Sequence, residues 1–167
     1  ATVASVSVYL AVLVFGFAAS AAYHLLPWDR SRPILARVDH AAIYLKIAGT
    51  YTPLVFVLGS VTGYIVLGFV WLVALGGAIA KLSFWATDGR GSLALYLALG
   101  WASVLLIWPM WSSLSGPAMA LVAAGGLTYS AGAVFFAMQE FRFQMALWHV
   151  FVLVASTCFF AAIALSV

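Results

Sequence analysis

Apolar stretches long enough to cross a lipid bilayer follow one another along almost the whole chain. Hydrophobic residues make up 66% of the 167 residues and charged residues only 7%, which leaves too little polar surface to solvate a globular protein of this size. Each stretch runs to about 20 residues, the length that an α-helix needs to span the hydrocarbon core. None shows the strict polar and apolar alternation of a membrane β-barrel strand. The sequence therefore predicts an all-α integral membrane protein.

About six spans of this length fit along the chain. We expect them near residues 2–26, 38–58, 61–82, 92–108, 115–138 and from 143 onward. Proline cannot continue the hydrogen bonding of a helix interior, so Pro27 and Pro109 should end the first and fourth spans and Pro53 should kink the second. No long linker separates the spans, so we expect residues 1–167 to form a single transmembrane helical domain.

The few charged residues gather in alternate connections between the spans. Those after the first, third and fifth spans hold Asp29, Arg30, Arg32 and Arg37; Lys81, Asp88 and Arg90; Glu140 and Arg142. Alternate connections of antiparallel spans share one side, which the positive-inside rule predicts to be cytoplasmic, with both termini outside. In a bacterium the chain would lie in the inner (plasma) membrane. The formal net charge of +3 is spread over short loops, so no continuous basic surface for nucleic acid is expected.

The three histidines of the chain are all expected near that charged side. His24 lies one turn before the end of the first span, with Ser20 on the same helical face. Asp39 and His40 open the second span, and His149 lies about six residues inside the last, at a depth of roughly 9 Å. Ionisable groups inside a membrane are costly, so several at one depth indicate a metal or proton site.

Other interpretations of these polar residues stay open. A histidine near a helix end can bond a neighbouring carbonyl or face lipid headgroups, and His40 is the strongest case because it points about 100° away from Asp39. Lys46 lies two turns deeper than Asp39 on a similar face, where it could pair with that residue, line a polar cavity or snorkel. Cys158 lies about 13 Å deeper than His149 and cannot share a metal with it.

Four stretches of sequence carry a resemblance to a known family. They are Ser20-Ala-Ala-Tyr-His24; Arg37-Val-Asp39-His40-Ala-Ala-Ile43 running into Ile47-Ala-Gly-Thr-Tyr-Thr-Pro53; Gly125-Gly-Leu-Thr-Tyr-Ser-Ala-Gly132-Ala-Val-Phe-Phe136; and Trp148-His149-Val-Phe-Val-Leu153. Their order and their coverage of nearly the whole chain resemble the hemolysin III family. That family belongs with the progestin and adipoQ receptors, which are seven-helix membrane proteins.

The resemblance implies a zinc ion near the cytoplasmic face, in a fold whose relatives include ceramide-hydrolysing enzymes. His24 and His149 correspond to metal ligands of the family. Asp39 corresponds to the acidic residue that orients or deprotonates the attacking water, and Ser20 to its hydroxyl neighbour. The first helix of the family has no counterpart here, which implies a chain truncated at its N-terminus or a short family member.

The chain departs from the family pattern at two positions. Met145 stands where the receptor branch has another histidine, and Phe159 stands where many hemolysin III members have one. Methionine is a poor zinc ligand, so a third protein ligand would have to be Asp39, His40 or a residue of a segment not present here.

Three functions are compatible with these residues. The first is a zinc-dependent hydrolase of a lipid amide or ester, or a lipid-homeostasis protein with the same site, in which Asp39 and Ser20 serve catalysis. The second is a non-enzymatic membrane signalling or cytolytic protein, which Met145 favours. The third is a haem-binding membrane anchor with His24 and His149 as axial ligands. A carboxylate at the same depth suits a hard cation better than a porphyrin. Membrane lipids are the expected partners in each case.

Overall fold

The computed structural model describes residues 2–84, 90–138 and 142–167. Asp88 and Glu140, two of the charged residues between the spans, lie outside these described residues. Throughout the described ranges the regular structure is helical and no strand occurs. Six helical spans are long and apolar enough to cross a membrane, which confirms the prediction of an all-α membrane protein.

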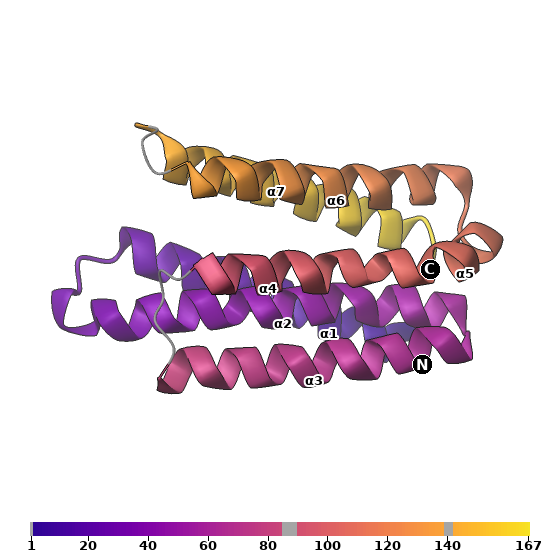
Figure 1. Cartoon of the computed structure of the whole chain (residues 1–167), viewed down its shortest axis with the longest axis horizontal. Helices are drawn as coiled ribbons and strands as arrows, with labels where there is room; N and C mark the ends of the chain where they lie inside the picture. The colour runs from indigo at the N-terminus through magenta and orange to yellow at the C-terminus, as the bar shows by residue number, and fades with distance from the viewer. Residues whose placement is uncertain (1, 85–89, 139–141) are drawn as a thin grey trace. The chain divides into compact units, whose positions relative to one another are not determined.

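The helices follow the chain in the order shown in Figure 1. They are α1 (Thr2–Leu25), the 3₁₀ helix η1 (Asp29–Ser31), α2 (Arg32–Leu58), α3 (Val61–Ser83), α4 (Arg90–Trp101), the 3₁₀ helix η2 (Ala102–Leu106), α5 (Ile107–Ser113), α6 (Gly116–Ala137) and α7 (Gln144–Ala164). The first, third, fifth and sixth predicted spans agree with α1, α3, α6 and α7 to within one or two residues. The second and fourth spans differ from the prediction.

The second span begins earlier than predicted. Helix α2 starts at Arg32, with Pro33 in its first turn, where the missing N–H group of proline costs no helical hydrogen bond. Asp39 and His40 therefore lie about two turns inside α2 and do not open it. The helix also continues through Pro53.

The fourth span does not end at Pro109. Helix α4 passes through η2 into α5, and the span that can cross a membrane runs over Gly91–Ser113. Pro109 is the third residue of α5, and proline is tolerated in the first turn of a helix because the N–H groups there have no partner within the helix. The prediction that proline closes this span was wrong for that reason.

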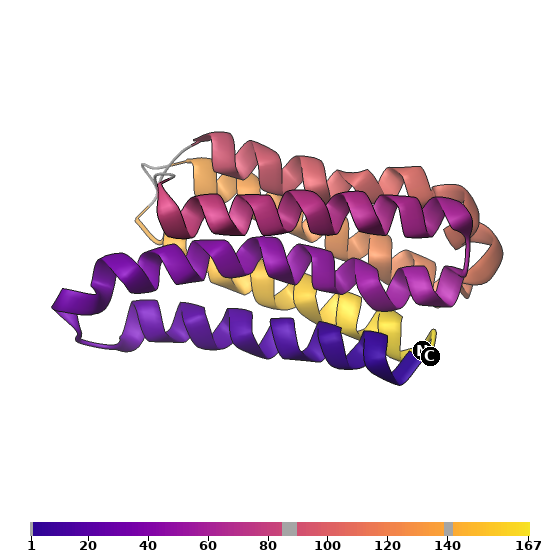
Figure 2. The ribbon, with the colours of Figure 1, turned by 90° about the horizontal axis from the view of Figure 1, so that it is seen from below.

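The chain divides into two compact units, Ala1–Ser92 and Leu93–Val167, and each is described by itself. In the first unit α2 runs antiparallel to both α1 and α3 and packs against each (Figures 1 and 2). Twelve residues of α2 are buried, against three of α1 and seven of α3. Helix α2 is therefore the core of this unit.

Small residues allow the helices of the first unit to approach closely. A Cβ atom added at Gly77 of α3 would lie 2.6 Å from Cε1 of Tyr44 in α2, and Gly49 of α2 receives the side chain of Val12 from α1 in the same way. Membrane helices commonly use small residues in this manner, because lipid offers no hydrophobic drive for helices to associate.

Arg37 connects α2 to the C-terminal end of α3. Its Nη1 donates hydrogen bonds to the carbonyl oxygens of Lys81 at 3.3 Å and Leu82 at 3.2 Å. These are among the last carbonyls of α3, which lack partners within their own helix. The bonds hold the α1–α2 connection and the C-terminal end of α3 at the same end of the unit, as Figure 2 also shows.

Helices α6 and α7 form an antiparallel pair in the second unit. The ring of Phe159 lies against Gly125, where an added Cβ atom would come within 2.8 Å of it. About one turn nearer to the connection between α6 and α7, the Tyr129 hydroxyl lies 2.9 Å from Oγ of Ser156. That Oγ lies 2.7 Å from the carbonyl oxygen of Val152. Since a carbonyl only accepts, Ser156 donates to Val152 and Tyr129 donates to Ser156.

We expect Gly77→Ala to lower the free energy of unfolding by about 1–3 kcal/mol, because the new methyl group would overlap the Tyr44 ring. The neighbouring Gly76 has no atom within 4 Å of an added Cβ, so Gly76→Ala should leave stability unchanged or slightly raise it. Thermal unfolding of both variants in the same detergent measures the difference. An equal loss of stability in the two would contradict this account of the α2–α3 contact.

We expect a double-mutant cycle on Tyr129→Phe and Ser156→Ala to show a coupling of about 0.5–1.5 kcal/mol, the usual range for hydrogen bonds between membrane helices. The control is Thr157→Ala, since the Thr157 hydroxyl bonds only the Leu153 carbonyl of its own helix among the contacts described. Pairing Tyr129→Phe with Thr157→Ala should give additive effects. Additivity in both cycles would show that the hydroxyl contact does not hold α6 to α7.

Candidate functional site

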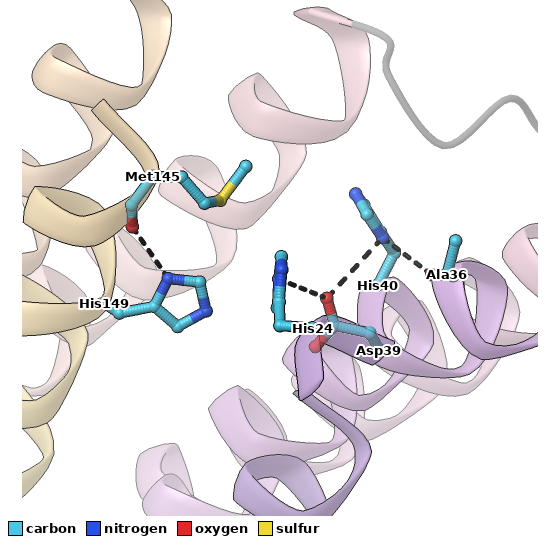
Figure 3. A network of polar contacts seen from close by, with 6 residues as sticks. All are labelled: His24, Ala36, Asp39, His40, Met145 and His149. Carbon is cyan, nitrogen blue, oxygen red and sulfur yellow. Dashed lines mark hydrogen bonds and ion pairs between the residues drawn. The ribbon is translucent and has the colours of Figure 1, made fainter. Parts of the chain in front are cut away.

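His24, Asp39 and His40 meet at the end of the first unit where α1 passes into α2 (Figure 3). Nε2 of His24 lies 4.0 Å from Oδ2 of Asp39, and Nδ1 of His40 lies 3.9 Å from the same oxygen. The Asp39 side chain is only 14% exposed and that of His24 28%. The antiparallel pairing of the two helices thus brings one carboxylate between two imidazoles, inside a membrane-spanning region where each such group is costly.

Aromatic contacts hold the end of α1 beside the start of α2. The Tyr23 ring meets the His24 ring edge to face, with 4.5 Å between the ring centroids. The guanidinium of Arg32 lies over the same Tyr23 ring, 5.9 Å from its centroid. A cation over an aromatic face is attracted by its quadrupole, so the first residue of α2 helps to fix the turn that carries His24.

The His40 ring is oriented by its own helix. Its Nδ1 lies 2.7 Å from the Ala36 carbonyl oxygen (Figure 3), and a carbonyl can only accept a hydrogen bond, so Nδ1 carries the proton. That nitrogen cannot also bind a metal, although it is the one nearest to Asp39, and only Nε2 of His40 could serve as a ligand. Of the two residues expected as a third ligand, Asp39 is the better placed, because its Oδ2 lies 4.0 Å from Nε2 of His24.

His149 belongs to the second unit and is oriented in the same way. It lies in α7, five residues after the first residue of that helix, and its Nδ1 lies 2.7 Å from the Met145 carbonyl oxygen. Nδ1 therefore donates and Nε2 is the nitrogen that can bind a metal. Metal-binding histidines usually have their second nitrogen held in this manner. The interpretation that a histidine bonds a neighbouring carbonyl is confirmed for His40 and His149. The sequence did not indicate which carbonyl, and in both cases it is the one four residues earlier.

The donor atoms of the first unit suit zinc, but they are few. Zinc ligands at about 2.0–2.2 Å in tetrahedral geometry lie about 3.4 Å apart, and the His24 and Asp39 atoms, at 4.0 Å, need only a small shift to reach that separation. Within residues 2–84, 90–138 and 142–167 there is no group of three or more His, Cys, Asp or Glu side chains that could hold a metal ion. The first unit thus offers two suitable ligands, where catalytic zinc sites usually have three.

Other residues singled out in the sequence have structural surroundings of different kinds. Ser20 lies one turn before His24 on the same face of α1. Phe159 stacks on the Tyr129 ring with 6.1 Å between centroids, so this position, where a histidine was expected from the family, is filled by aromatic packing. The ammonium of Lys46 lies 4.6 Å from the centroid of the Phe17 ring, a partner that sequence spacing alone did not indicate.

Comparison with known proteins gives matches along almost the whole chain. The family model described as "Haemolysin-III related" matches residues 1–160. Hemolysin-3 of Bacillus cereus is 37% identical over 160 residues, covering 95% of this chain and 71% of that protein. The Hemolysin-3 homolog of Bacillus subtilis (strain 168) is 35% identical over 161 residues, covering 95% of this chain and 75% of that protein.

A eukaryotic relative and the solved structures complete the comparison. The human Monocyte to macrophage differentiation factor is 31% identical over 157 residues, covering 88% of this chain and 63% of that protein, which fits the wider superfamily of progestin and adipoQ receptors. No solved structure matches the chain significantly. The family match and the Bacillus relatives identify the family, and the six long apolar helices fit a chain that crosses the membrane several times. The chain is therefore a multi-pass membrane protein that belongs to the hemolysin III family.

Proposed function

We propose that the protein is a zinc-dependent hydrolase of a membrane lipid, acting on an amide or an ester bond. The family resemblance assigns His24 and His149 as metal ligands, and Asp39 would be the third. The observation that carries the proposal is the approach of Nε2 of His24 to Oδ2 of Asp39, at 4.0 Å, inside a helical pair that spans the membrane. A histidine and a carboxylate are both ordinary zinc ligands.

The orientation of the histidines supports this role. Nδ1 of His149 is held by the Met145 carbonyl, so Nε2 presents its lone pair in the arrangement typical of zinc-binding histidines. The family resemblance assigns His24 and His149 to the same metal site. Buried ionisable groups in membrane spans also mark functional sites more often than packing sites, because an apolar residue would be less costly there.

The site would lie near the cytoplasmic face of a bacterial plasma membrane. Arg30, Arg32 and Arg37 all stand at the end of the first unit that carries His24, and the positive-inside rule assigns such an end to the cytoplasm. A lipid would reach the site laterally from the inner leaflet.

The chain supplies proton transfer and positioning for hydrolysis. Zinc, when bound, would polarise the lipid carbonyl and favour ionisation of a water molecule beside it. The oxygen of Asp39 that does not bind the metal would accept the proton of the attacking water and pass it to the leaving amine or alkoxide as the acyl bond breaks. The adjacent His40, held on the Ala36 carbonyl, would keep that carboxylate in place. The Ser20 hydroxyl, one turn before His24, would orient the substrate carbonyl.

A second candidate function is a membrane signalling or cytolytic protein without turnover. One observation favours it: among the described residues there is no group of three metal-binding side chains, and α7 carries Met145 where the receptor branch has a histidine. The name Hemolysin-3 of the Bacillus relatives agrees with a lytic activity of those proteins.

Metal content tests the site itself. We expect purified wild-type protein to carry zinc. The zinc content of His24→Ala and of His149→Ala should be lower by about tenfold or more, since removal of one of three ligands leaves an incomplete tetrahedral site. His40→Ala is the matched control and should keep its zinc, because Asp39, and not His40, is the proposed third ligand. Elemental analysis gives the answer. Equal zinc in all four proteins would end the proposal.

Turnover separates the two candidate functions. Zinc-loaded wild type should cleave a long-chain lipid amide or ester in mixed micelles. Asp39→Asn should be slower by about 10²–10⁴-fold, the usual contribution of a general base. The products are quantified by mass spectrometry. If zinc-loaded wild type leaves both lipids intact, the non-enzymatic candidate is favoured. A Soret band in the absorption spectrum of the protein as purified would instead indicate bound haem.

A further inference from the structure

Lys46 is held at mid-depth in the membrane-spanning part of α2. It lies 14 residues after the first residue of the helix, Arg32, and 12 before the last, Leu58, which places it about 18–21 Å from either end along the helix axis. A lysine side chain reaches about 6 Å, so its ammonium reaches neither end of the helix by snorkelling. A charge at such a depth is costly and marks a functional residue by default.

Helix α1 fixes the position of this charge. The ammonium lies 4.6 Å from the centroid of the Phe17 ring, within the range of a cation–π attraction. The stem of the side chain runs past Gly16, where an added Cβ atom would lie 3.5 Å from Cδ of Lys46. A Cβ atom at that distance would be in ordinary van der Waals contact, so the lysine stem packs against α1 at Gly16.

The charge lies on the same helix faces as the His24–Asp39 pair. Lys46 follows Asp39 by seven residues and Phe17 precedes His24 by seven, which is close to two helical turns in each case. Because α1 and α2 are antiparallel, the two contacts form two levels of one helix–helix contact. The Phe17–Lys46 level is about 10 Å deeper than the His24–Asp39 level.

At that distance a fixed charge acts on the shallower level through the low dielectric of the membrane interior. Asp39 alone gives that level a negative charge, which Lys46 attracts. Binding of a divalent cation raises the charge of the level by two units, and a positive charge about 10 Å away opposes this change appreciably at the effective dielectric constant of about 20 that applies to proteins.

On the basis of the function proposed above, we propose that Lys46 sets the metal affinity of the site. Its charge weakens the binding of zinc and keeps the ion exchangeable, so that occupancy follows the zinc concentration on the side from which the site is filled. Lys46 acts through the field of its ammonium and contacts neither metal nor lipid.

Zinc affinity, measured on the full chain in lipid nanodiscs by competition with a chelator, tests this role. We expect Lys46→Met to bind zinc about tenfold or more tightly than wild type, and Lys46→Arg to stay within about threefold of it, because arginine keeps the charge. Ile47→Met is the matched control at the same depth, and it should not change the affinity. If Lys46 mattered only for packing, the zinc affinity would not depend on whether the residue that replaces it carries a positive charge.

The outcomes distinguish this inference from the proposed function. If wild type binds no zinc, or binds zinc that His24→Ala also retains, the proposed function and the role of Lys46 both fail. If wild type binds zinc and His24→Ala loses it, while Lys46→Met has the wild-type affinity, the site stands and the role of Lys46 is wrong. Tighter binding by Lys46→Met and by Lys46→Arg alike would also overturn it, since charge would then not be the cause.

Discussion

The need to satisfy every backbone N–H and C=O group inside lipid governs this protein more than any other interaction. Water is absent from the hydrocarbon region, so each span must form its hydrogen bonds within itself, and helices result. Helix α2 keeps its path through Pro53 although proline lacks an N–H group, and at the end of α3, where the helix itself has no donors left, Arg37 donates to the last carbonyls. The requirement leaves the side chains to decide only which helix faces meet.

The number of spans and most of their limits could be predicted from the sequence, because hydrophobic length is a direct requirement of the bilayer. The start of α2 at Arg32 could not, since polar residues in its first two turns read as a loop by hydropathy. Pro109 was also misjudged, because proline ends a helix or begins one according to position, and hydropathy does not give the position. Of the paired glycines, Gly77 contacts the Tyr44 ring while Gly76 has open space beside it, a difference that depends on which face of the helix meets its neighbour.

The candidate site was only partly accessible to the same reasoning. The meeting of His24 with Asp39 follows from two antiparallel helices joined by a short connection, and sequence spacing indicated it. A carbonyl partner for a histidine was one interpretation of the sequence. The sequence could not indicate that the carbonyls are those of Ala36 and Met145, which orient the imidazoles, because every residue has a carbonyl. The contact of Lys46 with Phe17 could not be predicted either, since phenylalanine is common in membrane spans and nothing in the sequence indicates which ring a lysine contacts.

The bond from each of two imidazoles to the carbonyl four residues earlier has a mechanical consequence. His40 and His149 are each fastened to the helix that carries them, so the direction of the outer nitrogen is set by the rotation of that helix about its own axis. A helix that advanced by one residue would turn its ring by about 100°. Twisting of α2 or α7, for instance when bilayer thickness changes, would thereby aim or withdraw a nitrogen without any change of side-chain rotamer.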